Sequence, residues 1–278
     1  MDELTPNFSV AMSVYKNDNA TFFDKALESI TEGQTVKPTE IVLVVDGFID
    51  DGLNAVIEKY SKKYDIFNII RLPENLGLGN ALKIAVENSK NELIARMDSD
   101  DIAVSTRFEE QLNCFKNDNS LDIVGGNISE FIGDENNIVA YRRVPISDSD
   151  IKQYLRIRCP FNHMTVMYKK SAVQKSGGYL DLFWNEDYYL WIRMFLNNAK
   201  FANTGTTLVN VRTGSDMYSR RGGKCYFKSE VYLQNFMLKN KIINIFTYFT
   251  NIIKRFIVQL VLPNNVRGMV FRTFARNN

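Results

Sequence analysis

Three aspartates within four residues form the stretch of this sequence with the clearest chemical potential. Asp98, Asp100 and Asp101 follow an apolar, strand-like run over 93–97. Carboxylates held this close raise one another's pKa, and two unit charges 4 Å apart repel by about 4 kcal/mol at an effective dielectric near 20. A divalent cation relieves that repulsion, and oxygen ligands suit Mg²⁺ or Mn²⁺. The cluster therefore predicts a metal site; the alternative is an acidic turn that caps the next helix.

The composition is that of an ordinary folded protein and excludes several classes. The chain has 278 residues, of which 45% are hydrophobic and 24% charged, so it can bury a large core. The net charge of +2 gives no basic field for nucleic acid, and no nucleic-acid partner is expected. Three widely spaced cysteines and a single histidine exclude a zinc site of the usual type and argue against a disulfide framework. The polar N-terminus does not read as a signal peptide, so the cytoplasm is the expected compartment.

The first half of the chain alternates between strand-like and helix-like segments. Strands are expected over 8–14, 40–47, 67–72 and 93–97, and helices over 21–34, 53–64, 79–88 and 105–115. Four such units predict an α/β fold with a mostly parallel central sheet and helices on both faces. Ligands of these sheets bind beyond the carboxyl ends of the strands. Asp46 and Asp98 both end strands, so one cleft is expected to receive them.

A glycine-rich segment, Asn75 to Gly79, follows the third strand. Its glycines would let backbone amides approach a phosphate at a helix N-terminus, or they simply begin the helix. A dinucleotide fingerprint would follow the first strand and carry a third glycine. An NAD site is therefore not expected.

After about residue 120 the alternation stops. Segments 123–132 and 138–144 predict an antiparallel hairpin with its tip in the acidic loop 133–137, and a further strand is expected over 159–168. Short and longer helices are expected over 170–175 and 185–196. The longer one carries Glu186 and Asp187 in its first turn, where the helix dipole favours acidic residues in any case.

Together these motifs resemble bacterial family 2 glycosyltransferases, especially those that assemble O-antigen or exopolysaccharide repeats. The resemblance spans about residues 8 to 223 and rests on an ordered set of segments: the first strand, Val45-Asp46-Gly47, Asn75 to Ala81, Arg96 to Asp101, His163 to Val166 and Glu186 to Arg193. It implies a GT-A type catalytic domain over 1–223, with a nucleotide-binding half over about 1–118 and an acceptor half over about 119–223. Residues 224–278 would form a C-terminal helical region.

The resemblance also implies roles for individual residues. Asp46 matches the position that accepts a hydrogen bond from uracil, and Asp98 the position near the ribose and metal. Asp100 matches the carboxylate that binds Mn²⁺ or Mg²⁺ on the donor diphosphate, a charge-stabilising role. Asn75 and Gly77 fall on the nucleotide-sugar side. Asp187 matches the general base of a single displacement that inverts configuration, and Glu186 is the next candidate.

Further residues are assigned with an alternative beside each. Arg212, Arg220 and Arg221 would lie in a basic loop that closes over the diphosphate; the alternative is a solvated linker. His163 and Trp191 are assigned to the acceptor side, with packing inside the fold as the alternative. The Gln-x-x-Arg-Trp motif of processive members is absent, which disfavours a polymerising synthase.

The C-terminal region contains two apolar segments, 242–253 and 256–262, separated by Lys254 and Arg255. Neither reaches the roughly 20 residues needed to span a bilayer. With basic residues around them, they predict helices that lie on the inner surface of the bacterial cytoplasmic membrane. These basic residues are Lys239, Lys241, Lys254, Arg255, Arg267, Arg272 and Arg276. The alternatives are packing on the catalytic domain or on a second subunit, so a homodimer stays open.

The predicted function is transfer of a hexose from UDP-galactose or UDP-glucose to an undecaprenyl-diphosphate-linked saccharide, with a β-linked product. Two alternatives remain from the sequence. A sugar nucleotidyltransferase should carry a glycine-rich loop after its first strand, which residues 13–18 lack. A non-catalytic nucleotide-sugar-binding protein would keep Asp46 and Asp98 but have no need of Asp187.

Overall fold

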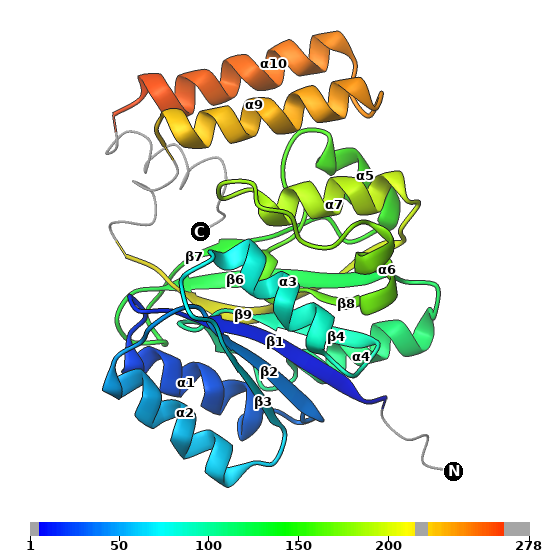
Figure 1. Cartoon of the computed structure of the whole chain (residues 1–278). Helices are drawn as coiled ribbons and strands as arrows, with labels where there is room; N and C mark the ends of the chain where they lie inside the picture. The colour runs from blue at the N-terminus through cyan, green and yellow to red at the C-terminus, as the bar shows by residue number, and fades with distance from the viewer. Residues whose placement is uncertain (1–5, 215–221, 264–278) are drawn as a thin grey trace.

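The computed structural model describes residues 6–214 and 222–263 and shows one large sheet with helices on both faces (Figure 1). The strands are β1 (Phe8–Val14), β2 (Glu40–Val45), β3 (Phe67–Arg71), β4 (Leu93–Met97), β5 (Ile102–Ala103), β6 (Ile123–Phe131), β7 (Ile138–Arg142), β8 (Met167–Lys169) and β9 (Phe201–Arg212). The helices are α1 (Ala20–Thr31), α2 (Asp51–Lys63), α3 (Leu78–Asn88), α4 (Arg107–Asn117), α5 (Asp148–Leu155), α6 (Lys170–Lys175), α7 (Glu186–Leu196), α9 (Lys224–Lys239) and α10 (Ile245–Phe256). A 3₁₀ turn, η1 (His163–Thr165), and a π turn, η2 (Ile257–Val261), complete the described elements.

The sheet has the predicted α/β topology. Its strand order is β3-β2-β1-β4-β8-β6-β9-β5, with β7 paired to β6. Strands β1 to β4 run parallel, whereas β8 is antiparallel to both β4 and β6. The chain adds β2 and β3 on one side of β1 and then crosses to add β4 on the other. A crevice at the carboxyl ends of β1 and β4 is the usual ligand site of such a sheet.

Two apolar clusters sandwich the sheet. All six residues of β2 are buried, as expected for a strand covered on both faces. One cluster joins the sheet to α1, α2 and α4, and the other joins it to α3, α5 and α7. Figure 1 shows α1 and α2 on the opposite side of the sheet from α7, α9 and α10. Strands β4 and β8 are neighbours, so the sheet runs across residue 118, where the two halves were predicted to divide.

The second half differs from its prediction in three places. The hairpin of β6 and β7 is confirmed, but the strand expected over 159–168 is wrong: only β8 is extended. The residues just before β8 form the turn η1 instead. The Thr165 hydroxyl stabilises this turn by donating to the carbonyl of Asn162 at 2.8 Å. Strand β9 and helix α5 were not predicted. Strand β9 contains two asparagines and a glycine, which are depleted in strands and weaken its signal.

Strand β6 can pair with β9 because two of its residues lack side chains. A Cβ on Gly125 would lie 2.4 Å from a side-chain oxygen of Asn203, and one on Gly126 would lie 2.5 Å from Leu208. The register between the two strands shifts at this point. The bend directs the end of β6 toward the carboxyl ends of β1 and β4.

Helices α9 and α10 form a hairpin at one end of the molecule (Figure 1). Leu233 and Met237 of α9 are fully buried in the cluster around α7, so this helix packs on the body that contains the sheet. Helix α10 begins at Ile245 rather than 242, because the Asn244 side chain caps it and Ile242 and Ile243 are buried in the turn before it. Among residues 6–214 and 222–263, no helix is both long and apolar enough to cross a bilayer.

Candidate active site

The aspartate cluster lies at the carboxyl end of β4. One carboxylate oxygen from each of Asp98, Asp100 and Asp101 lies within 4.8 Å of the others. Among the described residues, this is the one group of three or more histidine, cysteine, aspartate or glutamate side chains that could hold a metal ion. Although Asp100 keeps an accessible surface, loss of hydration and then the charges of Asp98 and Asp18 raise its pKa to about 6. Burial and the same crowding raise the pKa of Asp101 well above its usual value. The all-oxygen donor set and its excess negative charge fit a divalent cation.

A buried arginine lies behind the cluster. Arg96 of β4 is 1% exposed, and its Nη2 lies 2.5 Å from Oδ1 of Asp98. Its positive charge also opposes part of the rise in the pKa values of Asp100 and Asp101, and it does the same for Glu186 and Asp187. Sequence reasoning placed Arg96 in the motif but gave it no role. Its signal was a charged residue inside an otherwise apolar strand.

Asp46 and the glycine-rich segment hold each other in place. The Asp46 carboxylate accepts hydrogen bonds from the backbone amides of Leu76 and Gly77, at 2.7 and 3.0 Å, and from the Asn75 side chain at 3.0 Å. Gly47 has φ +85°, and a Cβ there would lie 2.8 Å from the Asn75 nitrogen. The two loops therefore approach closely at the start of α3. The glycines serve this packing as well as the start of the helix.

These residues line one side of a cavity of about 470 Å³, which we call the aspartate cavity. Its acidic lining residues are Asp18, Asp46, Asp98, Asp100, Asp101 and Glu130, and its arginines are Arg142 and Arg212. Asp18 was missed by sequence reasoning. It lies in the loop after β1, accepts a hydrogen bond from Ser99 at 2.9 Å, and has its pKa raised to about 6, mainly by burial and partly by Asp98.

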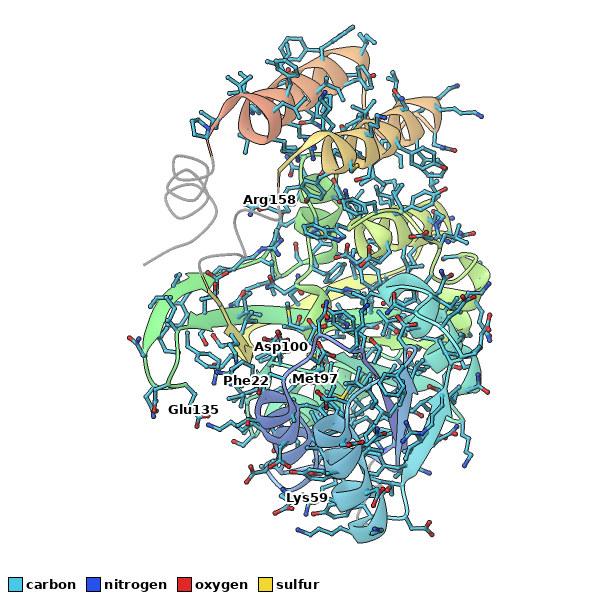
Figure 2. All side chains as sticks on the ribbon, turned by 60° about the vertical axis from the view of Figure 1, so that its left-hand side comes forward. Phe22, Lys59, Met97, Asp100, Glu135 and Arg158 are labelled. Atoms are coloured by element: carbon cyan, nitrogen blue, oxygen red, sulfur yellow. The ribbon has the colours of Figure 1, made fainter. Side chains whose placement is uncertain are left out.

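Arg212 closes this cavity from the end of β9. Its backbone amide donates to Asp101 at 2.9 Å and its Nε to the Asp100 carbonyl at 3.2 Å. The guanidinium carbon lies 3.8 Å from the ring centre of Phe22 and 4.6 Å from that of Phe131. Phe22 and Asp100 are labelled near each other in Figure 2. Arg220 and Arg221, predicted to act with Arg212, lie outside the described residues.

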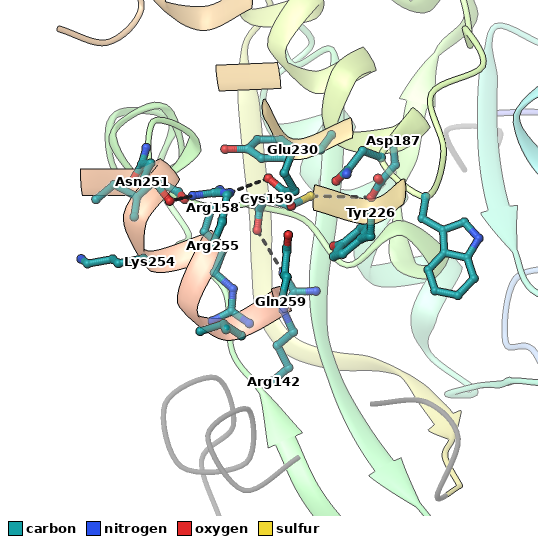
Figure 3. A pocket seen from close by; sticks show the side chains of 15 residues that line it. Arg142, Arg158, Cys159, Asp187, Tyr226, Glu230, Asn251, Lys254, Arg255 and Gln259 are labelled. Atoms are coloured by element: carbon teal, nitrogen blue, oxygen red, sulfur yellow. Dashed lines mark hydrogen bonds and ion pairs between the residues drawn. The ribbon is translucent and has the colours of Figure 1, made fainter. Parts of the chain in front are cut away.

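A second cavity, of about 360 Å³, adjoins the first, and we call it the arginine cavity (Figure 3). The two cavities share Arg142 and Trp184. Asp187 lines the arginine cavity, where the thiol of Cys159 lies 3.6 Å from its Oδ2 and the Arg142 guanidinium donates to the Cys159 carbonyl at 3.0 Å. Asp187 is therefore within reach of the junction between the cavities.

Asp187 and Glu186 begin α7 but face different surroundings. Burial raises the pKa of Asp187, which makes its carboxylate a stronger base, and Arg96 and Arg142 partly oppose this. The pKa of Glu186 is raised to about 7 by burial and by the charge of Asp187. Glu186 lines neither cavity and lies against α3, where a Cβ on Gly79 would be 3.4 Å from its own.

Neither of the two residues expected on the acceptor side lines either of these cavities. Trp191 has no exposed surface, since helical periodicity directs it into the core, and it cannot contact an acceptor in this conformation. His163 bonds to the Tyr179 hydroxyl at 2.9 Å, and burial followed by the charge of Arg96 lowers its pKa well below the usual value. It lines neither cavity. The tryptophan at the cavities is instead Trp184, which is 43% exposed and has φ +57°.

Comparison with known proteins decides the family. The chain matches the family described as glycosyl transferase family 2 over residues 9–177, more than half of its length. This chain belongs to that family. The chain is thus a glycosyltransferase, and the nucleotidyltransferase and binding-protein alternatives are set aside.

The chain is similar to several bacterial glycosyltransferases. It is 39% identical to an uncharacterized glycosyltransferase of Haemophilus influenzae, over 97% of this chain and 99% of that one. It is 38% identical to the amylovoran biosynthesis glycosyltransferase AmsE of Erwinia amylovora, over 84% and 86%. It is 33% identical to the UDP-Gal:alpha-D-GlcNAc-diphosphoundecaprenol beta-1,3-galactosyltransferase of Escherichia coli, over 99% of both chains.

A solved structure shows the same fold at much lower identity. S. aureus TarS 1-349 in complex with UDP superposes with a TM-score of 0.63 and 17% identity, over 96% of this chain and 75% of that chain. The glycosyltransferase therefore has the GT-A fold that its motifs predicted.

Proposed function

We propose that this glycosyltransferase is a metal-dependent, inverting enzyme that moves a hexose from UDP-galactose or UDP-glucose to a lipid-linked saccharide in O-antigen or exopolysaccharide synthesis. One observation carries the proposal: a three-aspartate cluster lines one cavity and the carboxylate of Asp187 lines another, and the two cavities meet at Arg142 and Trp184. The donor would occupy the aspartate cavity and the acceptor the arginine cavity. The name of the relative from Escherichia coli supports the donor and acceptor classes and favours galactose.

The residues divide the reaction between the two cavities. Asp98 and Asp100 would hold Mn²⁺ or Mg²⁺, which when bound neutralises charge on the donor diphosphate. Asp46, Asn75 and Gly77 would bind the nucleotide, with Arg212 beside the diphosphate. Asp187 would take the proton of the acceptor hydroxyl as its oxygen bonds to the anomeric carbon. The bond from that carbon to the diphosphate breaks at the same time, so UDP leaves with the electron pair and an α-linked donor gives a β-linked product.

We assign the membrane side of the protein to α10. Its apolar side chains project outward on one face: Ile245, Phe246, Phe249, Ile253 and Phe256 are each at least 47% exposed. Lys239 and Lys241 lie exposed just before the start of this helix, whereas Lys254 lines the arginine cavity. An apolar face bordered by cations suits the surface of an anionic membrane. Arg255 is not available for this contact, because it pairs with Glu230 at 2.5 Å.

The test is acceptor-dependent release of UDP from a panel of UDP-sugars, with a synthetic amino-sugar acceptor on a lipid diphosphate. Release from one donor, lost with EDTA and restored by Mn²⁺, is the expected result. Asp187→Asn should reduce it by about 10²–10⁴-fold with UDP binding intact, the usual contribution of a general base. Glu186→Gln is the matched control and should retain most activity. Full activity of Asp187→Asn would move the base elsewhere.

A further inference from the structure

We propose that the arginine cavity contains a binding site for the diphosphate of the lipid-linked acceptor, formed by Arg158 and Lys254 with Arg142 at its inner end. This inference rests on the proposed function, because it takes the arginine cavity to be the acceptor side. It adds to the acceptor side a subsite for the diphosphate, which is separate from the carboxylate of Asp187. Figure 3 shows these side chains around the cavity, and Figure 2 labels Arg158 on the side of the catalytic domain toward α10.

The charges that line the cavity favour an anion. Four cationic side chains line it, Arg142, Arg158, Lys254 and Arg255, against two carboxylates, Asp187 and Glu230. Arg255 and Glu230 form a buried pair and neutralise each other. The remaining three cations outnumber Asp187, and in the described part of the chain no carboxylate forms an ion pair with Lys254. Both phosphates of a diphosphate diester are negatively charged, and arginine and lysine bind them through charge-assisted hydrogen bonds.

The C-terminal hairpin fixes the loop that presents Arg158. Nη2 of Arg255 donates to the Ile157 carbonyl at 2.9 Å, and the Asn251 side chain donates to the Arg156 carbonyl at 3.0 Å. The Tyr188 hydroxyl holds the Leu155 carbonyl on the preceding turn. Groups held in place before binding lose less entropy when the ligand arrives. The hairpin thus completes the cavity wall and does more than cover the domain.

The position of the subsite matches the connectivity of such an acceptor. Trp184 lies where the cavity meets the aspartate cavity, and Asp187 lines the arginine cavity three residues further along the chain, so the acceptor sugar would lie there. Its diphosphate, attached directly to that sugar, would then reach the cations. Val258 also lines the cavity, and its neighbours Phe256 and Ile257 are exposed. A lipid chain would therefore leave along the apolar face of α10, where we place the membrane.

The first test compares two acceptors of the full-length enzyme: the amino sugar on an alkyl diphosphate, and the same sugar on a neutral alkyl chain. Lys254→Gln and Arg158→Gln should each raise KM for the diphosphate acceptor about tenfold, since each removes one charge-assisted contact. KM for the neutral acceptor and for the donor should not change. Arg156→Gln is the matched control, because Arg156 is exposed in the same loop and does not line the cavity. Equal effects on both acceptors, or none on either, would overturn the proposal.

The second test does not depend on turnover. Farnesyl diphosphate and inorganic pyrophosphate are titrated by calorimetry with EDTA present, so that a metal in the aspartate cavity cannot hold them. The native chain should bind farnesyl diphosphate, and Lys254→Gln should weaken binding about tenfold, whereas Arg156→Gln should not. If Lys254→Gln weakens the binding of both probes in parallel, the cavity holds a phosphate site. If it weakens the binding of farnesyl diphosphate alone, the cavity holds a lipid site. Undiminished binding by Lys254→Gln and Arg158→Gln would refute the subsite even if the transferase reaction proved different.

Discussion

The guanidinium of Arg96 pairs with Asp98 at 2.5 Å, and its charge acts both on the aspartate cluster and on Glu186 and Asp187 at the start of α7. One buried cation thereby offsets part of the negative charge of the aspartate cluster and of the first turn of α7. Nε and Nη1 of Arg96 have no hydrogen-bond partner among the described residues, so its charge matters more than its bonding. Removing such a charge leaves the carboxylates uncompensated.

Arg96→Met is therefore expected to lower the free energy of unfolding by about 3–5 kcal/mol, the usual cost of breaking a buried ion pair from one side. Urea denaturation measures this. Arg71→Met, at an exposed position of β3, should change stability by less than about 0.5 kcal/mol. Saturating Mn²⁺ should restore part of the loss, since it neutralises the same aspartates. A loss below about 1 kcal/mol would contradict this account of Arg96.

Glu186 makes the stability of the enzyme depend on pH. Its pKa rises from 4.5 to about 7 on folding, so the folded state holds a proton that the unfolded state releases between these values. Stability is fully present below pH 4.5 and is lost as pH rises toward 7. Glu186→Gln should therefore raise the free energy of unfolding at pH 8 by on the order of 1–3 kcal/mol relative to the native chain, with little difference at pH 5. Urea denaturation at the two pH values measures this.

The matched control is Glu58→Gln. Glu58 is exposed on α2, and its pKa is lowered by Lys62, so the substitution should bring no gain at pH 8. If Glu186→Gln and the native chain gave the same urea denaturation curve at pH 8, the Glu186 carboxylate would be better solvated than its position indicates.

The two tryptophans should separate activity from stability. Trp184→Ala removes a ring that lines both cavities, and it should reduce kcat/KM at least tenfold with little change in unfolding. Trp191→Ala empties a fully buried site and should cost about 3–5 kcal/mol of stability. Activity assays and urea denaturation of both variants make the comparison. Normal activity of Trp184→Ala would remove this residue from the site.

The exposed face of α10 should bind anionic membranes. Phe246→Ser combined with Phe249→Ser removes two of its exposed rings and should weaken binding to phosphatidylglycerol vesicles at least tenfold in sedimentation assays. Val139→Ser with Tyr141→Ser is the control, because these exposed apolar residues lie on β7. Unchanged vesicle binding would refute the assignment. A dimer of the native chain that dissociates in the α10 variant would assign this face to a second copy instead.

Local sequence determined the parts of this protein whose residues are neighbours in the chain. The alternation of apolar segments predicted β1 to β4 with their helices, because burial on both faces of a parallel sheet requires nearly continuous apolar strands. The aspartate cluster could be found for the same reason, since Asp98, Asp100 and Asp101 are held together by the chain itself. For Trp191 the sequence favoured an acceptor role and offered packing inside the fold only as the alternative, and the structure buries the side chain.

Tertiary structure alone decided what lies opposite those aspartates. Asp18 and Glu130 reach the aspartate cavity from segments that no motif marked. Arg212 was expected near the diphosphate in a loop, but the structure places it at the end of β9, a polar strand with no clear periodicity. Trp184 reaches both cavities because the backbone turns through a left-handed conformation just before α7. The arginine cavity brings Arg158, Asp187 and Lys254 together only because α9 packs its apolar face on the catalytic domain and carries α10 with it. Packing between distant segments fixed these distances, and no local pattern encodes them.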